Sequence, residues 1–115
     1  MTRATVNRIC SALPGAEVSD PWGGGHDCWK VGGKMFAAIG SRDLGVSVKC
    51  ADLETADMLR EIGMGIKAPY LHATWILIPW GRVDEAELTH RLRTSYILIR
   101  STLTRAARAA LPPFP

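Results

Sequence analysis

The chain has 115 residues, of which 47% are hydrophobic and 22% are charged, and its formal net charge is +3. This length and composition are typical of one globular domain, and they exclude a disordered chain and a scaffold that depends on disulfides. No apolar run approaches the roughly 20 residues that a membrane-spanning helix needs, and residues 1–13 lack the apolar core of a signal peptide. We therefore expect one cytoplasmic domain over residues 1–115, with no membrane partner, and we favour a monomer.

The N-terminal segment predicts an amphipathic helix. Its apolar residues recur at i, i+3, i+4 and i+7 within residues 2–13, which gives a single stripe. Pro14 and Gly15 end this helix. A short extended piece over residues 17–22 and a glycine loop over residues 23–25 follow it.

A β-hairpin is the next strong signal. Residues 27–31 and 34–40 flank Gly32 and Gly33, and adjacent glycines supply the positive φ angles that a two-residue turn requires. An uninterrupted alternation then fixes a register. In that register, Val31 faces Lys34, Trp29 faces Phe36, and Cys28 and Lys30 share the other face with Met35, Ala37 and Ile39.

The middle of the chain predicts a strand, a helix and another strand. Residues 45–50 alternate as a half-buried strand does. Residues 52–62 predict a helix that starts at the N-cap Asp52 and stops at Gly63, with an apolar residue at every third position from Leu53 to Ile62. Residues 63–69 form a loop, and residues 74–79 are rich in β-branched and aromatic side chains, as strands are.

The last helix has the clearest start in the chain. Asp84 suits the N-cap and Glu87 the N3 position of a variant capping box. One apolar stripe continues to Ala106, which predicts a single long helix. The order helix, three to four strands, helix, strand, helix indicates an α+β domain, with a mainly antiparallel sheet and helices packed on one face.

Short motifs in a fixed order span nearly the whole chain. They are LPG at 13–15, PWG at 21–23, KVGGKMFA at 30–37, VKC at 48–50, APYL at 68–71, TW at 74–75 and SY at 95–96. This ordered set resembles the MmcQ/YjbR family. The resemblance implies a CyaY/frataxin-like fold and DNA binding through a double wing of hairpins. A glycine-rich, acid-containing insert at residues 23–27 departs from the family pattern.

Basic residues favour DNA as the partner. Carried over by position, the first wing is the hairpin with Lys30 and Lys34 at its turn, and Arg42, Lys49 and Lys67 are neighbouring basic candidates. The last helix adds five arginines and no acidic residue after its first turn. The leading hypothesis is a DNA-binding protein that makes mainly non-specific phosphate contacts through these residues.

An aromatic set supports a second hypothesis. Trp22, Tyr70 and Trp75 are candidates to line a groove, in which a non-catalytic domain would bind a small molecule or a protein. The two hypotheses differ in whether the basic side chains merge into one face.

Metal binding and catalysis have weaker signals. The run His26-Asp27-Cys28 is dense in metal ligands, but adjacent strand residues point to opposite faces, so we expect neither a metal site nor a cofactor. Cys10, Cys28 and Cys50 lack pairing motifs and are expected to be reduced core residues. A nucleophilic cysteine needs a base and an orienting group, and ordinary core packing accounts better for these three, so we do not expect an enzyme.

Overall fold

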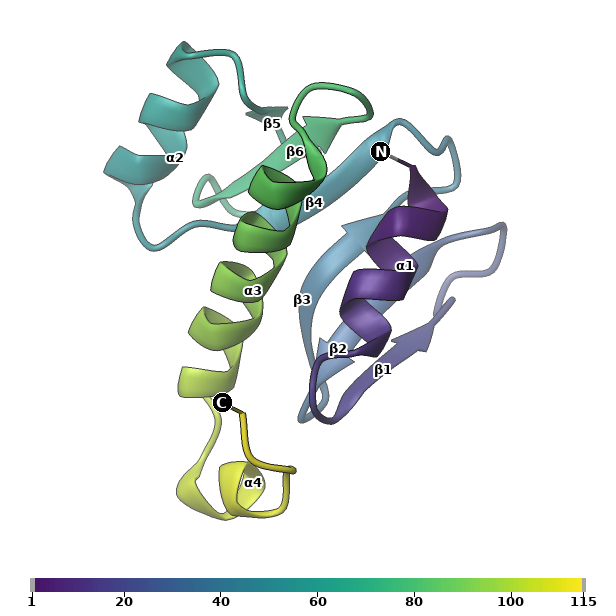
Figure 1. Cartoon of the computed structure of the whole chain (residues 1–115), viewed down its shortest axis with the longest axis vertical. Helices are drawn as coiled ribbons and strands as arrows, with labels where there is room; N and C mark the ends of the chain where they lie inside the picture. Colours follow the sequence, from purple (N-terminus) through teal and green to yellow (C-terminus); the bar gives the residue numbers. More distant parts are fainter. Residues whose placement is uncertain (1, 115) are drawn as a thin grey trace.

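The computed structural model describes residues 2–114 (Figure 1). Within them the helices are α1 (Arg3–Ser11), α2 (Leu53–Glu61), α3 (Glu85–Ser101) and α4 (Arg105–Ala109). The strands are β1 (Ala16–Ser19), β2 (Asp27–Val31), β3 (Lys34–Ile39), β4 (Gly45–Lys49), β5 (Ile66–Lys67) and β6 (Trp75–Pro79). They form one antiparallel sheet in the order β1-β2-β3-β4-β6-β5, which confirms the expected α+β class.

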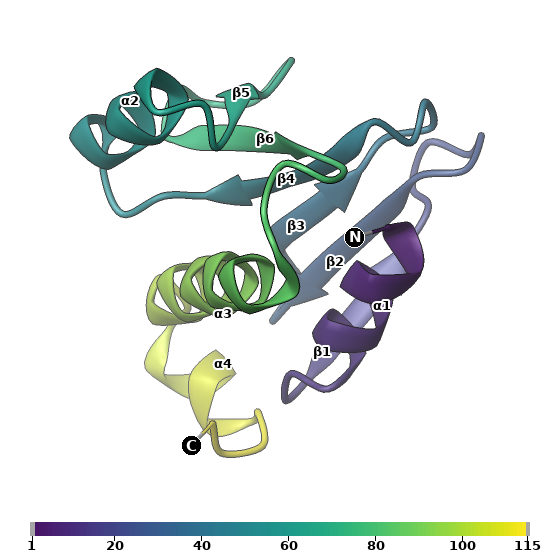
Figure 2. The same cartoon turned by 45° about the horizontal axis from the view of Figure 1, so that its top comes forward.

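Helices α1 and α3 pack side by side on one face of the sheet, α1 over β1 and α3 over β3 and β4 (Figures 1 and 2). The stripe expected on α1 is confirmed, because Val6, Ile9 and Cys10 are buried. On α3, Leu92 and Tyr96 are fully buried against the same core. We call the opposite face of β2, β3, β4 and β6 the open face. None of the helices formed by residues 2–114 is long and apolar enough to span a bilayer.

A β-bulge interrupts the hairpin of β2 and β3. Val31 pairs with Lys34 as expected, but the register shifts beside Trp29, which pairs with Ala37 and not with Phe36. The predicted Trp29–Phe36 pair is therefore wrong. The extra residue in β3 increases the local twist and changes which side chains reach each face.

The bulge moves part of β3 into the core. Ala37 and Ile39 are fully buried there, whereas Cys28, Met35 and Ala38 line the open face. The prediction that Ala37 and Ile39 share the face of Cys28 is wrong, because it assumed an unbroken two-residue period.

Ser95 of α3 joins β3 to β4 beside this bulge. Its buried hydroxyl donates to the carbonyl oxygen of Phe36 at 2.6 Å and accepts from the backbone N–H of Lys49 at 2.9 Å. The β3–β4 ladder joins only two pairs of residues, so Ser95 satisfies backbone groups that the ladder leaves unpaired.

The helices start where the sequence predicts but differ in their faces and ends. The Asp52 carboxylate accepts from the N–H of Thr55 at 2.7 Å, and this hydrogen bond lowers the pKa of Asp52. Leu53 and Ile62 are exposed, contrary to the expected stripe. They lie nine positions apart, and at about 100° per residue that spacing places them on opposite sides of the helix.

The prediction of one long last helix is wrong beyond Ser101. Helix α3 ends there, and Thr104 starts α4 as an N-cap whose hydroxyl accepts from the N–H of Ala107 at 3.1 Å. Ala106, predicted to lie on the apolar stripe, is exposed. Asp84 caps α3 as expected, accepting from the N–H of Glu87 at 2.8 Å.

The turn after α3 packs on the hairpin turn, which yields a test of the fold. Gly32 and Gly33 both have positive φ, but a Cβ on Gly32 would meet Leu103 Cδ1 at 2.5 Å, whereas one on Gly33 would meet no atom within 4 Å. We expect Gly32→Ala to lower the free energy of unfolding by about 1–2 kcal/mol more than Gly33→Ala, because only the former also overpacks. Urea denaturation of both variants measures the difference, and equal losses would contradict this packing.

Candidate functional site

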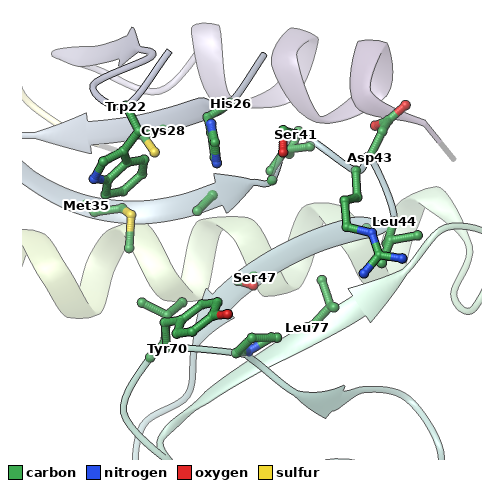
Figure 3. A pocket seen from close by; sticks show the side chains of 17 residues that line it. Trp22, His26, Cys28, Met35, Ser41, Asp43, Leu44, Ser47, Tyr70 and Leu77 are labelled. Atoms are coloured by element: carbon green, nitrogen blue, oxygen red, sulfur yellow. The ribbon is translucent and has the colours of Figure 1, made fainter. Parts of the chain in front are cut away.

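The open face carries a hollow of about 660 Å³ (Figure 3). This volume lies within the range of small-molecule sites, roughly 300–1,000 Å³. Its lining comes from four strands and three loops: Trp22, His26, Cys28, Met35, Ala38, Ile39, Gly40, Ser41, Arg42, Asp43, Leu44, Gly45, Ser47, Pro69, Tyr70, Leu71 and Leu77.

One hydroxyl stands out on the apolar floor of the hollow. Met35, Ala38 and Leu77 supply apolar surface. Ser47 of β4 lies between Met35 and Leu77 in Figure 3. Ser47 is only 8% exposed, and its hydroxyl makes no hydrogen bond within residues 2–114. Because no buried side-chain polar atom there lacks a partner, this hydroxyl is open to the hollow. A nearly buried hydroxyl that faces a hollow is positioned to bond a ligand or a water molecule.

Two aromatic side chains form the rim. Figure 3 shows Trp22 beside His26 on one wall and Tyr70 on the opposite wall. Trp22 is 70% exposed and Tyr70 is fully exposed. Tyr70 also has a φ of 66°, a conformation that costs a residue with a side chain roughly 1–2 kcal/mol. Exposed aromatic groups on both walls of an apolar hollow are typical of a binding site.

Local hydrogen bonds hold Trp22 in place. The Asp20 carboxylate accepts from the N–H groups of Gly25 at 3.0 Å and His26 at 3.2 Å. His26 Nδ1 lies 2.9 Å from the carbonyl oxygen of Gly23. The rings of Trp22 and His26 pack edge to face with centroids 5.3 Å apart. The glycine-rich loop is therefore a hydrogen-bonded turn that presents Trp22.

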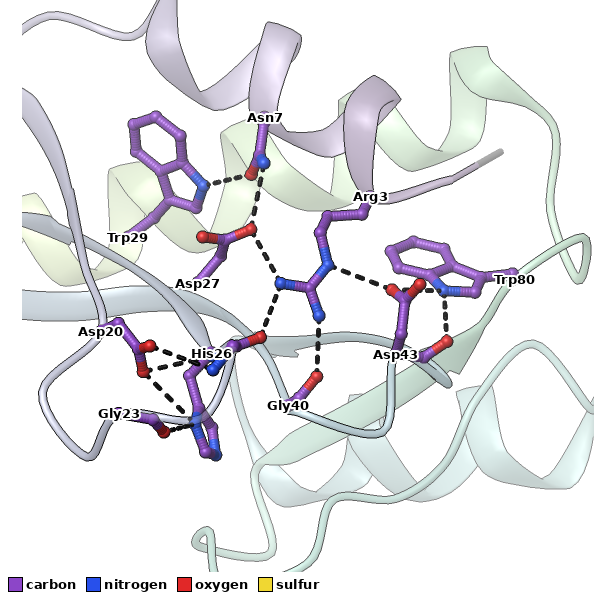
Figure 4. A network of polar contacts seen from close by, with 11 residues as sticks. Arg3, Asn7, Asp20, Gly23, His26, Asp27, Trp29, Gly40, Asp43 and Trp80 are labelled. Carbon is purple, nitrogen blue, oxygen red and sulfur yellow. Dashed lines mark hydrogen bonds and ion pairs between the residues drawn. The ribbon is translucent and has the colours of Figure 1, made fainter.

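Arg3 of α1 ties together the two loops beside the hollow (Figure 4). Its guanidinium donates to the carbonyl oxygens of Gly25 at 2.7 Å and Gly40 at 2.9 Å. It also pairs with Asp27 at 3.0 Å and Asp43 at 3.2 Å. Desolvation lowers the pKa of Arg3, but the hydrogen bonds with Asp43 and Asp27 outweigh it and leave that pKa raised.

Two indole groups extend the same network. Asn7 donates to Asp27 at 3.1 Å and accepts from Trp29 Nε1 at 2.8 Å. Trp80 Nε1 donates to the backbone oxygen of Asp43 at 2.8 Å and to its carboxylate at 3.2 Å. These bonds connect α1, the strands and both loops (Figure 4), so they position the walls of the hollow.

Arg42 is the cation of the hollow. It lines the cavity and has no ion pair or hydrogen bond within the part of the chain that the structure describes. The neighbouring carboxylate of Asp43 is taken by Arg3 and Trp80 and points away from the hollow (Figures 3 and 4). The positive charge of Arg42 is therefore not neutralised by its neighbour.

The structure separates the two hairpin lysines. Lys30 pairs with Met35, so it lies on the open face, where it is opposite Glu17 of β1. Lys34 pairs with Val31 of the core, so it lies on the helix side of the sheet. Residues paired across a ladder point to the same face, so Lys30 and Lys34 point to opposite faces.

The other basic candidates are also divided. Lys49 follows Ser47 by two residues in β4, which places it on the open face, and its amine donates to Thr74 at 3.0 Å. Lys67 pairs with the core residue Ile76 and lies on the other side. The structure thus brings Lys30, Arg42 and Lys49 to one face and leaves Lys34 and Lys67 outside it.

Most C-terminal arginines bond within the protein. Arg91 pairs with Glu87 at 2.6 Å, and Arg100 donates to the Tyr96 hydroxyl at 2.7 Å and to the Pro112 carbonyl at 2.8 Å. Arg93 lies over the ring of Phe114, and Arg108 donates to the Ser101 carbonyl at 3.1 Å. These contacts give the arginines a structural role along α3 and in the segment that follows it.

The predicted aromatic groove is partly correct. Trp22 and Tyr70 line the hollow, but Trp75 is 8% exposed, belongs to the core and does not line it. Ser47 is absent from the predicted site residues, although a serine between two valines in a strand points to the face opposite the valines. Arg3 is absent from them too, because its partners are 22 to 40 residues away.

The cysteines are free and buried, and they have raised pKa values. Burial raises the pKa of Cys10 to about 12, and it also raises the pKa of Cys28 and Cys50. Cys28 lines the hollow, yet no hydrogen bond joins it to His26 within residues 2–114. A buried thiol without a partnering base is a poor nucleophile at neutral pH.

Comparison with known proteins identifies the family. The YjbR family model matches residues 11–98. The chain belongs to the YjbR family. The crystal structure of the Deinococcus radiodurans protein DR2400, described as a DUF419 domain, is similar to this YjbR chain, with a TM-score of 0.83 and 25% identity. The likeness covers 94% of this chain and 86% of that one. No curated protein matches the YjbR chain significantly.

Proposed function

We propose that this YjbR-family chain is a non-catalytic recognition domain whose binding site is the hollow on the open face. The observation that carries the proposal is Ser47, whose accessible hydroxyl lies on the floor of an otherwise apolar cavity. A guest that covers this hydroxyl has to bond it, because a hydroxyl that is covered and left unpaired is unfavourable.

The chemistry of the walls defines the guest. Trp22 and Tyr70 suit a planar aromatic group, because stacked or edge-to-face rings gain energy beyond their buried area. Arg42 adds one unneutralised positive charge. The hollow therefore favours a small aromatic anion. Since Trp22 is held by its own loop, little side-chain ordering opposes binding.

A cavity-filling variant tests this proposal. Ala38 lies on the floor, so Ala38→Leu should fill the hollow without disturbing the core. We expect wild-type protein to enhance the fluorescence of the aromatic anion 1-anilinonaphthalene-8-sulfonate, and Ala38→Leu to remove most of that enhancement. Ala86→Leu, on the exposed side of α3, is the matched control and should bind as wild type does. Equal enhancement by wild type and Ala38→Leu would refute the hollow as the site.

Duplex DNA contact through the hairpin is the second candidate. It is favoured by Lys30, which makes no ion pair within residues 2–114, and by the resemblance that first suggested it. The geometry supports it less well, because Gly32 packs against Leu103 and the Lys34 amine lies 3.4 Å from the Thr102 hydroxyl. The hairpin therefore lies against α3 and does not project as a free wing.

A further inference from the structure

We infer that the hollow accepts one unpaired nucleotide of a single-stranded nucleic acid, with its base between the aromatic walls and its phosphate at Arg42. The inference rests on the proposed function and deepens it. It depends on three independent features: two exposed rings, a free hydroxyl on the floor and one unneutralised cation.

The aromatic walls match the flat faces of a base. Trp22 is 70% exposed yet held by the edge-to-face contact with His26, and Tyr70 stands on the opposite wall (Figure 3). Every base presents a π-face, so stacking of this kind tolerates any sequence. A strand could thus bind without a strong sequence preference.

The floor distinguishes a base from a hydrocarbon. A purely apolar guest would leave the Ser47 hydroxyl without a partner, whereas the polar edge of a heterocycle can bond it. The rest of the floor is apolar at Met35, Ala38 and Leu77. One hydroxyl in an otherwise apolar floor fits a flat ring with polar atoms on its edge.

Charge complementarity accounts for the phosphate. Arg42 lines the hollow, and the Asp43 carboxylate that could neutralise it is already bonded to Arg3 and Trp80. Lys49 lies on the same face at the other end of β4, so it adds positive charge to that face. The formal charge of +3 attracts a polyanion to the whole molecule.

A duplex does not satisfy this geometry. Its bases are stacked inside the helix, so a base can reach the Ser47 hydroxyl only after it leaves the stack, which costs a few kcal/mol. An unpaired strand avoids that cost. The inference therefore predicts a preference for single strands, opposite to that of a hairpin that reads duplex phosphates.

The experiment measures fluorescence anisotropy of a labelled oligothymidylate of about 12 nucleotides at about 50 mM salt, conditions suited to phosphate contacts. The unlabelled oligonucleotide should compete, whereas a duplex of equal length and thymidine monophosphate should compete at least tenfold more weakly. We expect Trp22→Leu to weaken binding about tenfold, as loss of one stacking partner does. Arg42→Gln should flatten the slope of log affinity against log salt by roughly 0.7.

Lys34→Gln, on the opposite side of the sheet, is the control and should bind as wild type does. If duplex competes equally and Lys34→Gln weakens binding, the hairpin reads the duplex and the inference is wrong. If thymidine monophosphate competes equally, the strand is not required and the inference is also overturned. If the anilinonaphthalene probe binds in the hollow but no nucleotide does, this inference fails while the proposed function survives; if neither binds, both fail.

Discussion

Replacing Ser95 with alanine is expected to lower the free energy of unfolding by about 3 kcal/mol, because each buried polar group left unpaired costs roughly 1–3 kcal/mol. Two groups lose their partner at once: the carbonyl oxygen of Phe36 and the N–H of Lys49. Both lie where the β3–β4 ladder stops and the bulge begins. The substitution therefore weakens the connection between β3 and β4. Urea denaturation, followed by circular dichroism, measures the loss.

Ser101→Ala is the matched control on the same helix. Its hydroxyl bonds only the Leu98 carbonyl at the exposed end of α3, so a change of about 0.5 kcal/mol or less is expected. A Ser95→Ala loss no larger than that of the control would show that the two backbone groups find other partners.

Replacing Arg3 with methionine is expected to have the second largest effect, a loss of about 2 kcal/mol, since hydrogen bonds to charged groups contribute roughly 1.5–3 kcal/mol each before solvent screening. The Arg3 side chain is 26% exposed, and its guanidinium bonds Gly25, Gly40, Asp27 and Asp43. Its loss releases both loops beside the hollow. Thermal denaturation gives the stability change, and backbone hydrogen exchange should quicken at residues 23–26 and 40–43.

Arg8→Met supplies the matched control on the same helix. Arg8 pairs with Glu85 at 2.8 Å, but the two side chains are 62% and 52% exposed. Exposed pairs contribute about 1 kcal/mol or less, so this variant should lose little stability and leave both loops protected. Equal effects of the two substitutions would show that the Arg3 network is an ordinary surface pairing.

Local signals predicted the elements well, because their causes lie within a few residues. The N-caps Asp52 and Asp84 bond N–H groups three residues away, and the paired glycines set the hairpin turn. The bulge could not be predicted in this way, since the group that supports it is Ser95, 59 residues from Phe36. Likewise, a stripe at every third position resembles a helical face only over a short stretch, which is why Ile62 was misplaced.

The site could be predicted only in part, because some of its features depend on contacts between residues far apart in the sequence. Trp22 and Tyr70 are exposed aromatic residues in loops, and the sequence marks both as groove candidates. Trp75 is also an aromatic residue but lies in the core. Residue type alone does not distinguish an exposed aromatic side chain from a buried one. Lys30 and Lys34 were both assigned to the wing because they flank its turn, although the register predicted from the same turn already places them on opposite faces, as the structure does.

The most direct test of the central claim maps where the aromatic anion binds. Amide spectra of ¹⁵N-labelled protein are recorded as 1-anilinonaphthalene-8-sulfonate is added. If the hollow is the site, the largest shifts fall on Trp22, His26, Ala38, Ser47 and Leu77, and the amides of Lys34 and Thr102 stay in place. Large shifts at Lys34 and Thr102, with none at Ala38 and Ser47, would contradict the account.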